Sequence, residues 1–194
     1  MSREDPLRAL PIDHATNQVA RKYTPVEQLR RIVWSFGRWL IVLSPRPFFG
    51  WRRLVLRLFG ARIGVHVNIY PTAHLYMPWN VELGDWSALG EHVFVYSLGK
   101  VTIGRNVTVS YRSHICAGTH DFSDRSLPLL KPPVTLEDDV WVGTDAFIGP
   151  GIVVGYGAIV GARAVVVKNV EPLAVVAGNP ARTVAQRALR EARR

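Results

Sequence analysis

The sequence predicts an all-β fold, a parallel β-helix whose triangular coils consist of six-residue repeats. An aliphatic residue returns every six positions from Leu136 to Val166 without drift, and glycine follows it in four of six repeats. Amphipathic helices place apolar residues three and four apart, and hairpins carry two-residue turns, so neither explains this period. Short strands joined by tight corners do explain it. The aliphatic positions are Leu136, Val142, Ile148, Val154, Val160 and Val166.

Three earlier blocks open with the same pattern, an aliphatic residue followed by glycine. Ile63, Leu83 and Ile103 lie 20 residues apart and each precedes a glycine. Each block holds three repeats plus two residues, which predicts one triangular coil with an enlarged corner. The aliphatic side chains are expected to point inward and stack on those of the next coil. Glycine is expected to form the corner, where the backbone needs conformations that a side chain disfavours.

Residues 1–60 are predicted to form a basic helical extension. Residues 1–25 show no period and are expected to wrap or fray. Residues 27–43 carry an apolar stripe at helical spacing, and Pro45 ends the pattern. A second amphipathic stretch follows near residues 51–58. The stripe consists of Leu29, Val33, Phe36, Leu40 and Leu43, and the second stretch of Trp51, Leu54, Val55 and Leu58.

These helices have two compatible interpretations. They can cap the open end of the β-helix, which needs a blocked strand edge. They can also form an interfacial surface that brings the protein to anionic lipid, where lipid-linked sugars lie. Capping is the favoured interpretation.

The charge is concentrated at the two ends of the chain. The 194 residues carry a net charge of +9, from 24 Lys and Arg against 15 Asp and Glu. Residues 1–60 hold 11 basic and 4 acidic residues, residues 61–180 hold 8 and 10, and residues 181–194 hold 5 and 1. A nucleic-acid surface would interleave cations with aromatic residues on the folded body, so no nucleic-acid partner is predicted.

Other classes are excluded by composition. A single cysteine rules out a disulfide framework and a Cys-ligated zinc site within the chain. The first 25 residues are too polar for a cleavable signal peptide. The expected location is therefore the cytoplasm, with peripheral contact to the inner face of the membrane if the helices bind lipid.

Several motifs resemble those of the hexapeptide-repeat acyltransferase superfamily. Val140–Thr144 reads V-W-V-G-T and Ala177–Arg182 reads A-G-N-P-A-R, as in this superfamily, and an irregular break begins near Ala117. The segments Leu56–Gly64, Pro78–Asn80 and Tyr96–Gly99 resemble colanic-acid and exopolysaccharide O-acetyltransferases, relatives of the maltose, galactoside and nodulation-factor acetyltransferases.

The resemblance covers about residues 60–185 and implies an architecture. It implies a left-handed β-helix over residues 61–180 with a loop at 119–133. A basic segment at 181–194 is expected as a short helix or tail. The resemblance also implies a homotrimer with active sites between subunits.

His120 is the candidate general base. Among six histidines it is the one that lies at the irregular break, and the resemblance places the catalytic histidine there. It would remove the acceptor hydroxyl proton as the oxygen attacks the acetyl-CoA thioester, then protonate the departing thiolate. Asp121 is the adjacent candidate for orienting the ring, with Asp124, Glu91 or a backbone carbonyl as alternatives.

The resemblance assigns further roles. The backbone N–H of Thr144, within the segment containing Trp141 and Gly143, would stabilise the oxyanion, and Ala162 would hold the pantetheine arm. Lys168 and Arg182 match positions that bind CoA phosphates. The family pattern has a second basic residue shortly after Arg182; Ala185 stands there in this sequence, and Arg187 is a candidate substitute. Glu91 and His92 lie near an acceptor-contacting Asn of relatives, which is absent here.

No metal is predicted, because His114 and His120 are six residues apart and fall on successive faces instead of one column. The resemblance implies an acetyl-CoA-dependent O-acetyltransferase acting on a saccharide or lipid-linked sugar of a surface polysaccharide pathway. The alternatives are N-acetylation of an amino or nucleotide sugar, and a non-catalytic β-helix scaffold. The histidine beside an irregular loop disfavours the scaffold.

Overall fold

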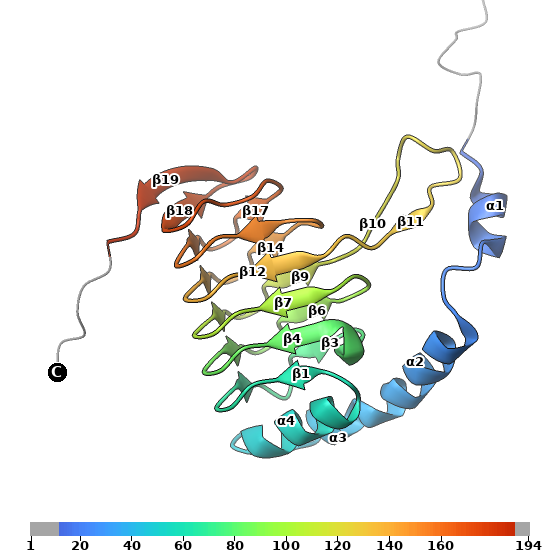
Figure 1. Ribbon diagram of the computed structural model, residues 1–194, viewed down its shortest axis with the longest axis horizontal. Helices are drawn as coiled ribbons and strands as arrows, with labels where there is room; N and C mark the ends of the chain where they lie inside the picture. The colour runs from blue at the N-terminus through green and yellow to red at the C-terminus, as the bar shows by residue number, and fades with distance from the viewer. Residues whose placement is uncertain (1–11, 189–194) are drawn as a thin grey trace, which may run out of the picture.

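The protein is a left-handed parallel β-helix of about six turns with helices at its N-terminal end (Figure 1). The computed structural model describes residues 12–188. The helices are α1 (His14–Val19), α2 (Pro25–Gly37), α3 (Trp39–Val42), α4 (Phe49–Leu58) and the 3-10 helix η2 (Pro78–Asn80).

Three sheets form the faces of the prism, named here A, B and C in the order in which each coil visits them. Face A contains β1 (Arg62–Ile63), β4 (Val81–Leu83), β7 (Val101–Ile103), β12 (Val134–Leu136) and β15 (Val153–Val154). Face B contains β2 (Asn68–Ile69), β5 (Ala88–Leu89), β8 (Thr108–Val109), β13 (Trp141–Val142), β16 (Ile159–Val160), β18 (Ala174–Ala177) and β19 (Arg182–Gln186). Face C contains β3 (His74–Leu75), β6 (Phe94–Tyr96), β9 (His114–Cys116), β14 (Phe147–Ile148) and β17 (Val165–Val166).

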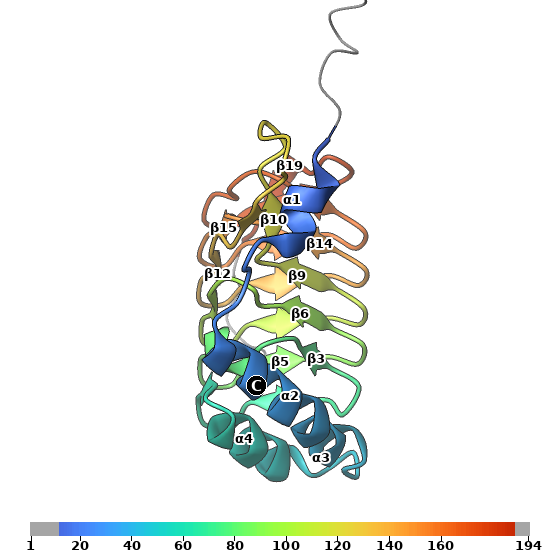
Figure 2. The ribbon, with the colours of Figure 1, turned by 90° about the vertical axis from the view of Figure 1, so that its right-hand side faces the viewer.

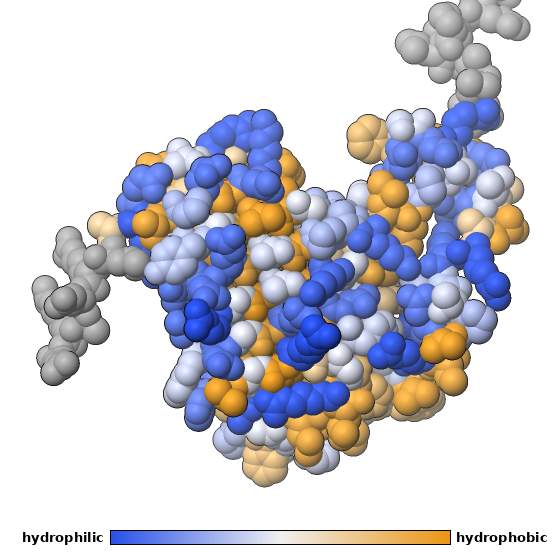
Figure 3. Space-filling model, in the orientation of Figure 1, coloured by the Kyte–Doolittle hydropathy of each residue, from blue (hydrophilic) through white to orange (hydrophobic). Residues whose placement is uncertain are grey.

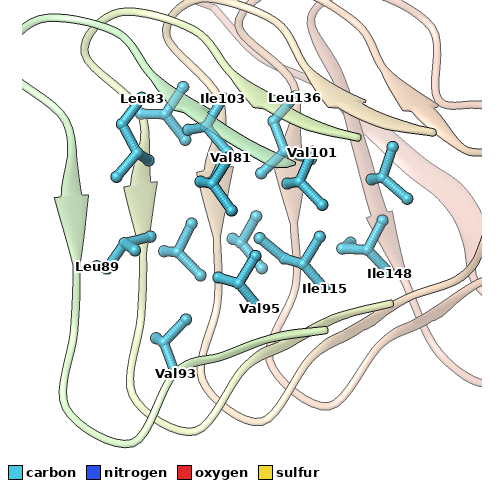
Figure 4. Close-up of a cluster of buried hydrophobic side chains, with 14 of the residues drawn as sticks. Val81, Leu83, Leu89, Val93, Val95, Val101, Ile103, Ile115, Leu136 and Ile148 are labelled. Carbon is cyan, nitrogen blue, oxygen red and sulfur yellow. The ribbon is translucent and has the colours of Figure 1, made fainter. Parts of the chain in front are cut away.

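The predicted repeat positions form the core. Ile63 pairs with Leu83, and Leu83 with Ile103, in parallel register on face A. Aliphatic side chains from all three faces point into the prism (Figure 4). Leu89 and Ile115, from faces B and C, are fully buried. The prediction of stacked triangular coils is confirmed, because each period-six aliphatic lies on the same face as its counterpart in the next coil.

The glycine that follows each repeat aliphatic is needed for a reason other than the predicted corner conformation. The left-handed backbone conformation falls two residues after the glycine, as at His66 and His92 with φ of 55° and 58°. The glycine itself is required by close approach of the next coil. A Cβ on Gly64 would lie 2.7 Å from the backbone N of Asp85, and one on Gly143 would lie 2.7 Å from the backbone N of Ala162.

Arginines of α4 close the open end of the prism. Many backbone N–H groups donate to carbonyls of the following coil, as Gly64 N does to Leu83 O. The corresponding carbonyls of the first coil have no earlier coil to pair with. Arg52, which is fully buried, donates to Ile69 O, Arg53 donates to Val67 O, and Arg57 donates to Ile63 O. Much of the N-terminal basic charge therefore satisfies a strand edge.

The predicted apolar stripe faces away from the prism. The buried apolar side chains of these helices are Trp34, Ile41, Val55 and Leu56, so of the second predicted stretch Val55 faces the prism. The stripe residues are exposed instead, Phe36 at 72% and Leu43 at 76%. Figure 3 shows apolar side chains gathered over this helical end. We call the set the outer apolar face: Leu29, Val33, Phe36, Trp39, Leu40 and Leu43 of α2, α3 and the residue after it, and Trp51, Leu54 and Leu58 of α4.

Both chain ends differ in part from expectation. Within residues 1–25, expected to wrap or fray, residues 14–19 form α1; residues 1–11 lie outside the described residues. Residues 182–186, expected in a short helix or tail, form β19, which pairs antiparallel with β18 and covers the last strand edge. Residues 189–194 also lie outside the described residues.

Candidate active site

A long loop carries His120 away from the prism. It leaves β9 on face C and returns to β12 on face A, so it springs from the C–A edge. Its stem is the antiparallel pair β10 (Thr119–His120) and β11 (Leu129–Leu130), which projects beside α1 (Figures 1 and 2). The pairing holds His120 at the exposed base of the loop, opposite Leu129.

The His120 ring contacts a backbone carbonyl. Its Nδ1 lies 2.6 Å from Leu127 O. A carbonyl oxygen only accepts hydrogen bonds, so Nδ1 carries the proton and Nε2 is left as the basic nitrogen. Of the orienting groups considered from the sequence, the geometry favours the backbone carbonyl.

Asp121 contacts the loop and not the imidazole. Its Oδ1 accepts hydrogen bonds from the backbone N of Ser123 at 2.9 Å and from Ser123 Oγ at 2.5 Å. These contacts lower the pKa of the Asp121 carboxyl below its usual value. Asp124 makes the equivalent turn with Ser126. Both carboxylates thus shape the loop that holds His120.

A second group of candidate residues lies along the B–C edge. Thr144 follows β13 on face B, and Ala162 occupies the same corner one coil later. The backbone N of Arg163 donates to Thr144 O, which ties these two corners together. Within residues 12–188 the N–H groups of Thr144 and Ala162 donate to no protein acceptor.

Glu91 and His92 lie on the same B–C edge, two coils before Thr144. Glu91 forms an ion pair with Arg46 at 3.2 Å. The His92 backbone N donates to Thr72 Oγ1 at 3.0 Å, and its ring meets Tyr111 edge-on at 5.5 Å. These contacts present the His92 ring at the surface.

Trp141 lies on face B beside the same edge. Its indole N–H donates to Ser110 Oγ at 3.0 Å, and about half of the side chain is exposed. Gly143, which follows it after Val142, is buried under the next coil. The pair places an exposed aromatic surface next to the free N–H of Thr144.

The candidate phosphate-binding cations lie on different edges. Lys168 follows β17 on face C, so it lies at the C–A edge above the loop, and it is exposed. Arg182 begins β19 and pairs with Ala177 at the B–C end of face B. Arg187 is not a substitute beside Arg182, because it donates to Asp139 O and Gly157 O at the A–B edge.

The candidate residues thus form two groups in one chain. The C–A edge holds His120, Asp121 and Lys168. The B–C edge holds Glu91, His92, Thr144, Ala162 and Arg182, with Trp141 and Gly143 beside it. Face C separates the two groups.

One contributor to the loop has no signal in the sequence. Asn17 of α1 donates to the carbonyls of Ser126 and Leu127. These residues are about 110 positions apart, and nothing in the local pattern around Asn17 indicates the pairing. Within residues 12–188, no three His, Cys, Asp or Glu side chains gather to hold a metal ion, and no helix has the length and apolarity to cross a bilayer.

A β-helix of six-residue repeats with an edge loop bearing an oriented histidine defines the class of hexapeptide-repeat acyltransferases. The chain is 36% identical to the "Putative colanic acid biosynthesis acetyltransferase WcaF" of Escherichia coli (strain K12), over 79% of this chain and 85% of the relative. The chain belongs to the hexapeptide-repeat acetyltransferase family. No protein-family profile matches it.

Solved structures share the fold. A maltose O-acetyltransferase from Clostridium difficile 630 superposes with a TM-score of 0.78 at 24% identity, covering 84% of this chain and 89% of that one. A hexapeptide-repeat acetyltransferase from Vibrio cholerae O1 biovar eltor, complexed with acetyl coenzyme A, gives 0.78 at 22% identity and covers 86% and 91%.

Proposed function

We propose that the protein is an acetyl-CoA-dependent O-acetyltransferase that acts on a saccharide hydroxyl in surface polysaccharide biosynthesis. The observation that carries this proposal is the His120 ring, whose Nδ1 is held by Leu127 O while the ring stays exposed. The WcaF relative supports the polysaccharide class of acceptor, and the Vibrio cholerae complex supports the donor.

The proposed reaction assigns one step to each of the candidate polar groups. The acceptor hydroxyl gives its proton to His120 Nε2 as its oxygen attacks the thioester carbonyl carbon. The C=O electron pair moves onto oxygen, and the N–H of Thr144 donates to that oxyanion. Collapse of the intermediate breaks the C–S bond, and the CoA thiolate takes the proton from His120. The products are an O-acetyl sugar and CoA.

The remaining candidates bind the two substrates in this proposal. Ala162 offers its free N–H to the pantetheine arm one coil beyond Thr144, and Lys168 and Arg182 attract the CoA phosphates. Glu91 and His92 contact the acceptor. In this proposal, both the C–A group and the B–C group contribute residues that bind CoA, and the B–C group also contacts the acceptor.

The active site in this proposal needs two chains. His120 and Thr144 lie on different edges of one prism, so a single chain does not bring the base to the oxyanion donor. A ring in which the C–A edge of each chain meets the B–C edge of the next completes every site. A homotrimer is the ring that we propose.

Face C, which lies between these edges, is suited to the centre of such a ring. Its outward side chains form a half-buried aromatic column. Phe94 lies 4.9 Å from His74 and from His114, and His114 lies 5.3 Å from Phe147. Face A presents charged groups instead, such as the ion pair of Arg62 with Glu82. Aromatic surface is what protein interfaces prefer to bury.

The Phe94→Glu variant is therefore expected to be monomeric. A carboxylate in the aromatic column would lose its hydration in the trimer, while in the monomer it faces water. Light scattering after size exclusion measures the mass. Val153→Glu, an outward apolar position on face A, is the matched control and should remain trimeric. A trimeric Phe94→Glu protein would contradict the assignment of face C.

Thiol release tests the proposed activity. The purified protein is incubated with acetyl-CoA and a panel of saccharides and lipid-linked sugars, and free CoA is measured with a thiol reagent. We expect release with hydroxyl acceptors, and mass spectrometry should show an alkali-labile acetyl ester. Release with amino sugars alone, giving an alkali-stable amide, would favour N-acetylation and overturn the proposal.

The outer apolar face is proposed to rest on an anionic bilayer. Residues 25–58 contain seven arginines and one acidic residue, Glu27. Three of the arginines donate to carbonyls of the prism and Arg46 pairs with Glu91, which leaves Arg30, Arg31 and Arg38 beside the outer apolar face. An anionic surface attracts this excess of positive charge, and a second copy of the face repels it. In a ring formed through the prism edges, the three faces point in the same direction. This arrangement would bring the enzyme to lipid-linked acceptors.

Vesicle co-sedimentation measures this contact. We expect the protein to sediment with phosphatidylglycerol-containing vesicles at low salt, and the Phe36→Glu/Leu40→Glu double variant to bind at least about tenfold more weakly, because two apolar side chains leave the interface. Val153→Glu is the control for added charge. Equal sedimentation of wild type and double variant, or none at low salt, would contradict the bilayer as partner.

A further inference from the structure

Helix α1 is attached to the loop that carries His120. Asn17 Nδ2 lies 2.6 Å from Ser126 O and 2.6 Å from Leu127 O. The backbone N of Asp13, which caps the same helix, donates to Arg125 O at 2.9 Å. Three consecutive carbonyls of the loop are therefore bound by one short N-terminal segment.

The orientation of the Asn17 amide is fixed by a third partner. Lys22 Nζ donates to Asn17 Oδ1 at 2.7 Å. An ammonium group only donates, so the amide oxygen faces Lys22 and the NH₂ group faces the loop. Each hydrogen of that NH₂ group has its own carbonyl, and the half-buried amide is fully paired.

Leu127 is the point where this contact meets the candidate base. Its φ of 48° lies in the left-handed region, which is unfavourable for a leucine. In this conformation its carbonyl accepts from both Asn17 Nδ2 and His120 Nδ1. The two lone pairs of the oxygen are thus shared between α1 and the imidazole.

We infer that Asn17 is a positioning residue for His120: it holds the Leu127 carbonyl that keeps the imidazole proton on Nδ1 and leaves Nε2 basic. The inference rests on the proposed function of His120. The turns at Asp121 and Asp124 are local to the loop and do not reach the Leu127 carbonyl. Without Asn17, Leu127 N still donates to Asp124 O, but the Leu127 carbonyl loses its donor from α1, and the acceptor of the imidazole is no longer fixed in place.

The test compares Asn17→Ala and Asn17→Asp in the full-length protein. Asn17→Asp preserves the contact with Lys22 but turns a carboxylate oxygen toward two carbonyls, so it should be at least as impaired as Asn17→Ala. Gln18→Ala, exposed on the same helix, is the control. We expect kcat to fall about tenfold in both Asn17 variants, because the ring loses its orientation. The KM for acetyl-CoA should be unchanged, because Asn17 contacts none of the proposed CoA-binding residues.

A spectroscopic measurement separates positioning from a structural role. With ¹⁵N-labelled histidine, the ring nitrogens of His120 report which of them carries the proton, and His120→Asn assigns the signal. We expect the Nδ1–H form in the wild type and in Gln18→Ala, and a shift toward Nε2–H in the Asn17 variants at an unchanged melting temperature.

The outcomes distinguish the two proposals. If His120→Asn is inactive while the Asn17 variants keep wild-type kcat and the Nδ1–H form, the positioning role is wrong and the base assignment stands. If His120→Asn keeps wild-type activity, the base assignment itself fails. A fall in kcat with the Nδ1–H form retained would also overturn the inference, since Asn17 would then act by another route.

Discussion

The His120→Asn variant is expected to lose about a thousandfold in kcat, the range that general-base catalysis supplies. Asparagine can keep the donor to Leu127 O, so the loop retains its contact while the basic Nε2 is removed. The KM for acetyl-CoA should change little, because the substitution removes a proton acceptor and none of the proposed CoA contacts at Ala162, Lys168 and Arg182. Steady-state thiol release with a saccharide acceptor measures both constants.

His66→Asn is the matched control for this substitution. His66 lies on the A–B edge, where its ring stacks on Trp86 at 4.0 Å, and its φ of 55° is one that asparagine adopts readily. We expect it to keep wild-type kcat. If His120→Asn retains activity within about threefold of the wild type, the hydroxyl proton has another acceptor and the base is not His120.

The repeat could be predicted from the sequence because every coil solves the same packing problem. Ile63, Leu83 and Ile103 occupy equivalent core positions in successive coils, so the same type of residue returns at a fixed spacing in the sequence. The role of the following glycine could not be predicted, because it depends on the distance to a neighbouring coil. For Gly143 that neighbour is Ala162, 19 residues later.

The orientation of the N-terminal helices could be predicted only in part. Helical spacing indicates a stripe, but Trp34 and Ile41 flank that stripe and are the residues that the prism buries. The spacing of apolar residues shows which of them share a face of the helix. It does not show whether that face packs against the prism or stays exposed. The arginines are a similar case, since Arg52 is fully buried against backbone carbonyls.

The candidate site shows the same limit. The irregular break identifies His120, because a loop interrupts the repeat there. The partner of its ring is a backbone carbonyl at Leu127, whose position depends on the fold of the loop and on Asn17 from the other end of the chain. Side-chain types in the sequence do not indicate a carbonyl, so the sequence favours the adjacent carboxylate of Asp121.

Mixed assemblies of the proposed homotrimer are expected to recover activity from two inactive parents. His120→Asn removes the C–A half of a site, and Ala162→Trp fills the proposed pantetheine path on the B–C half. Ala162 is exposed, so the prism accommodates the indole. Each variant alone should show near-background thiol release. In a 1:1 co-expressed mixture, about a quarter of the sites pair two intact halves, because each site takes one edge from each of two chains.

A second mixture distinguishes this arrangement from a site within one chain. Wild-type subunits co-expressed 1:1 with the His120→Asn/Ala162→Trp double variant should give about a quarter of wild-type activity if two chains build each site, and about half if one chain does. Recovery in the first mixture depends on the same geometry, since a single-chain site leaves every subunit with one damaged half. About a quarter of wild-type activity in both mixtures would therefore show that His120 and Thr144 act across a subunit boundary. No recovery of activity in the first mixture would place them within one chain.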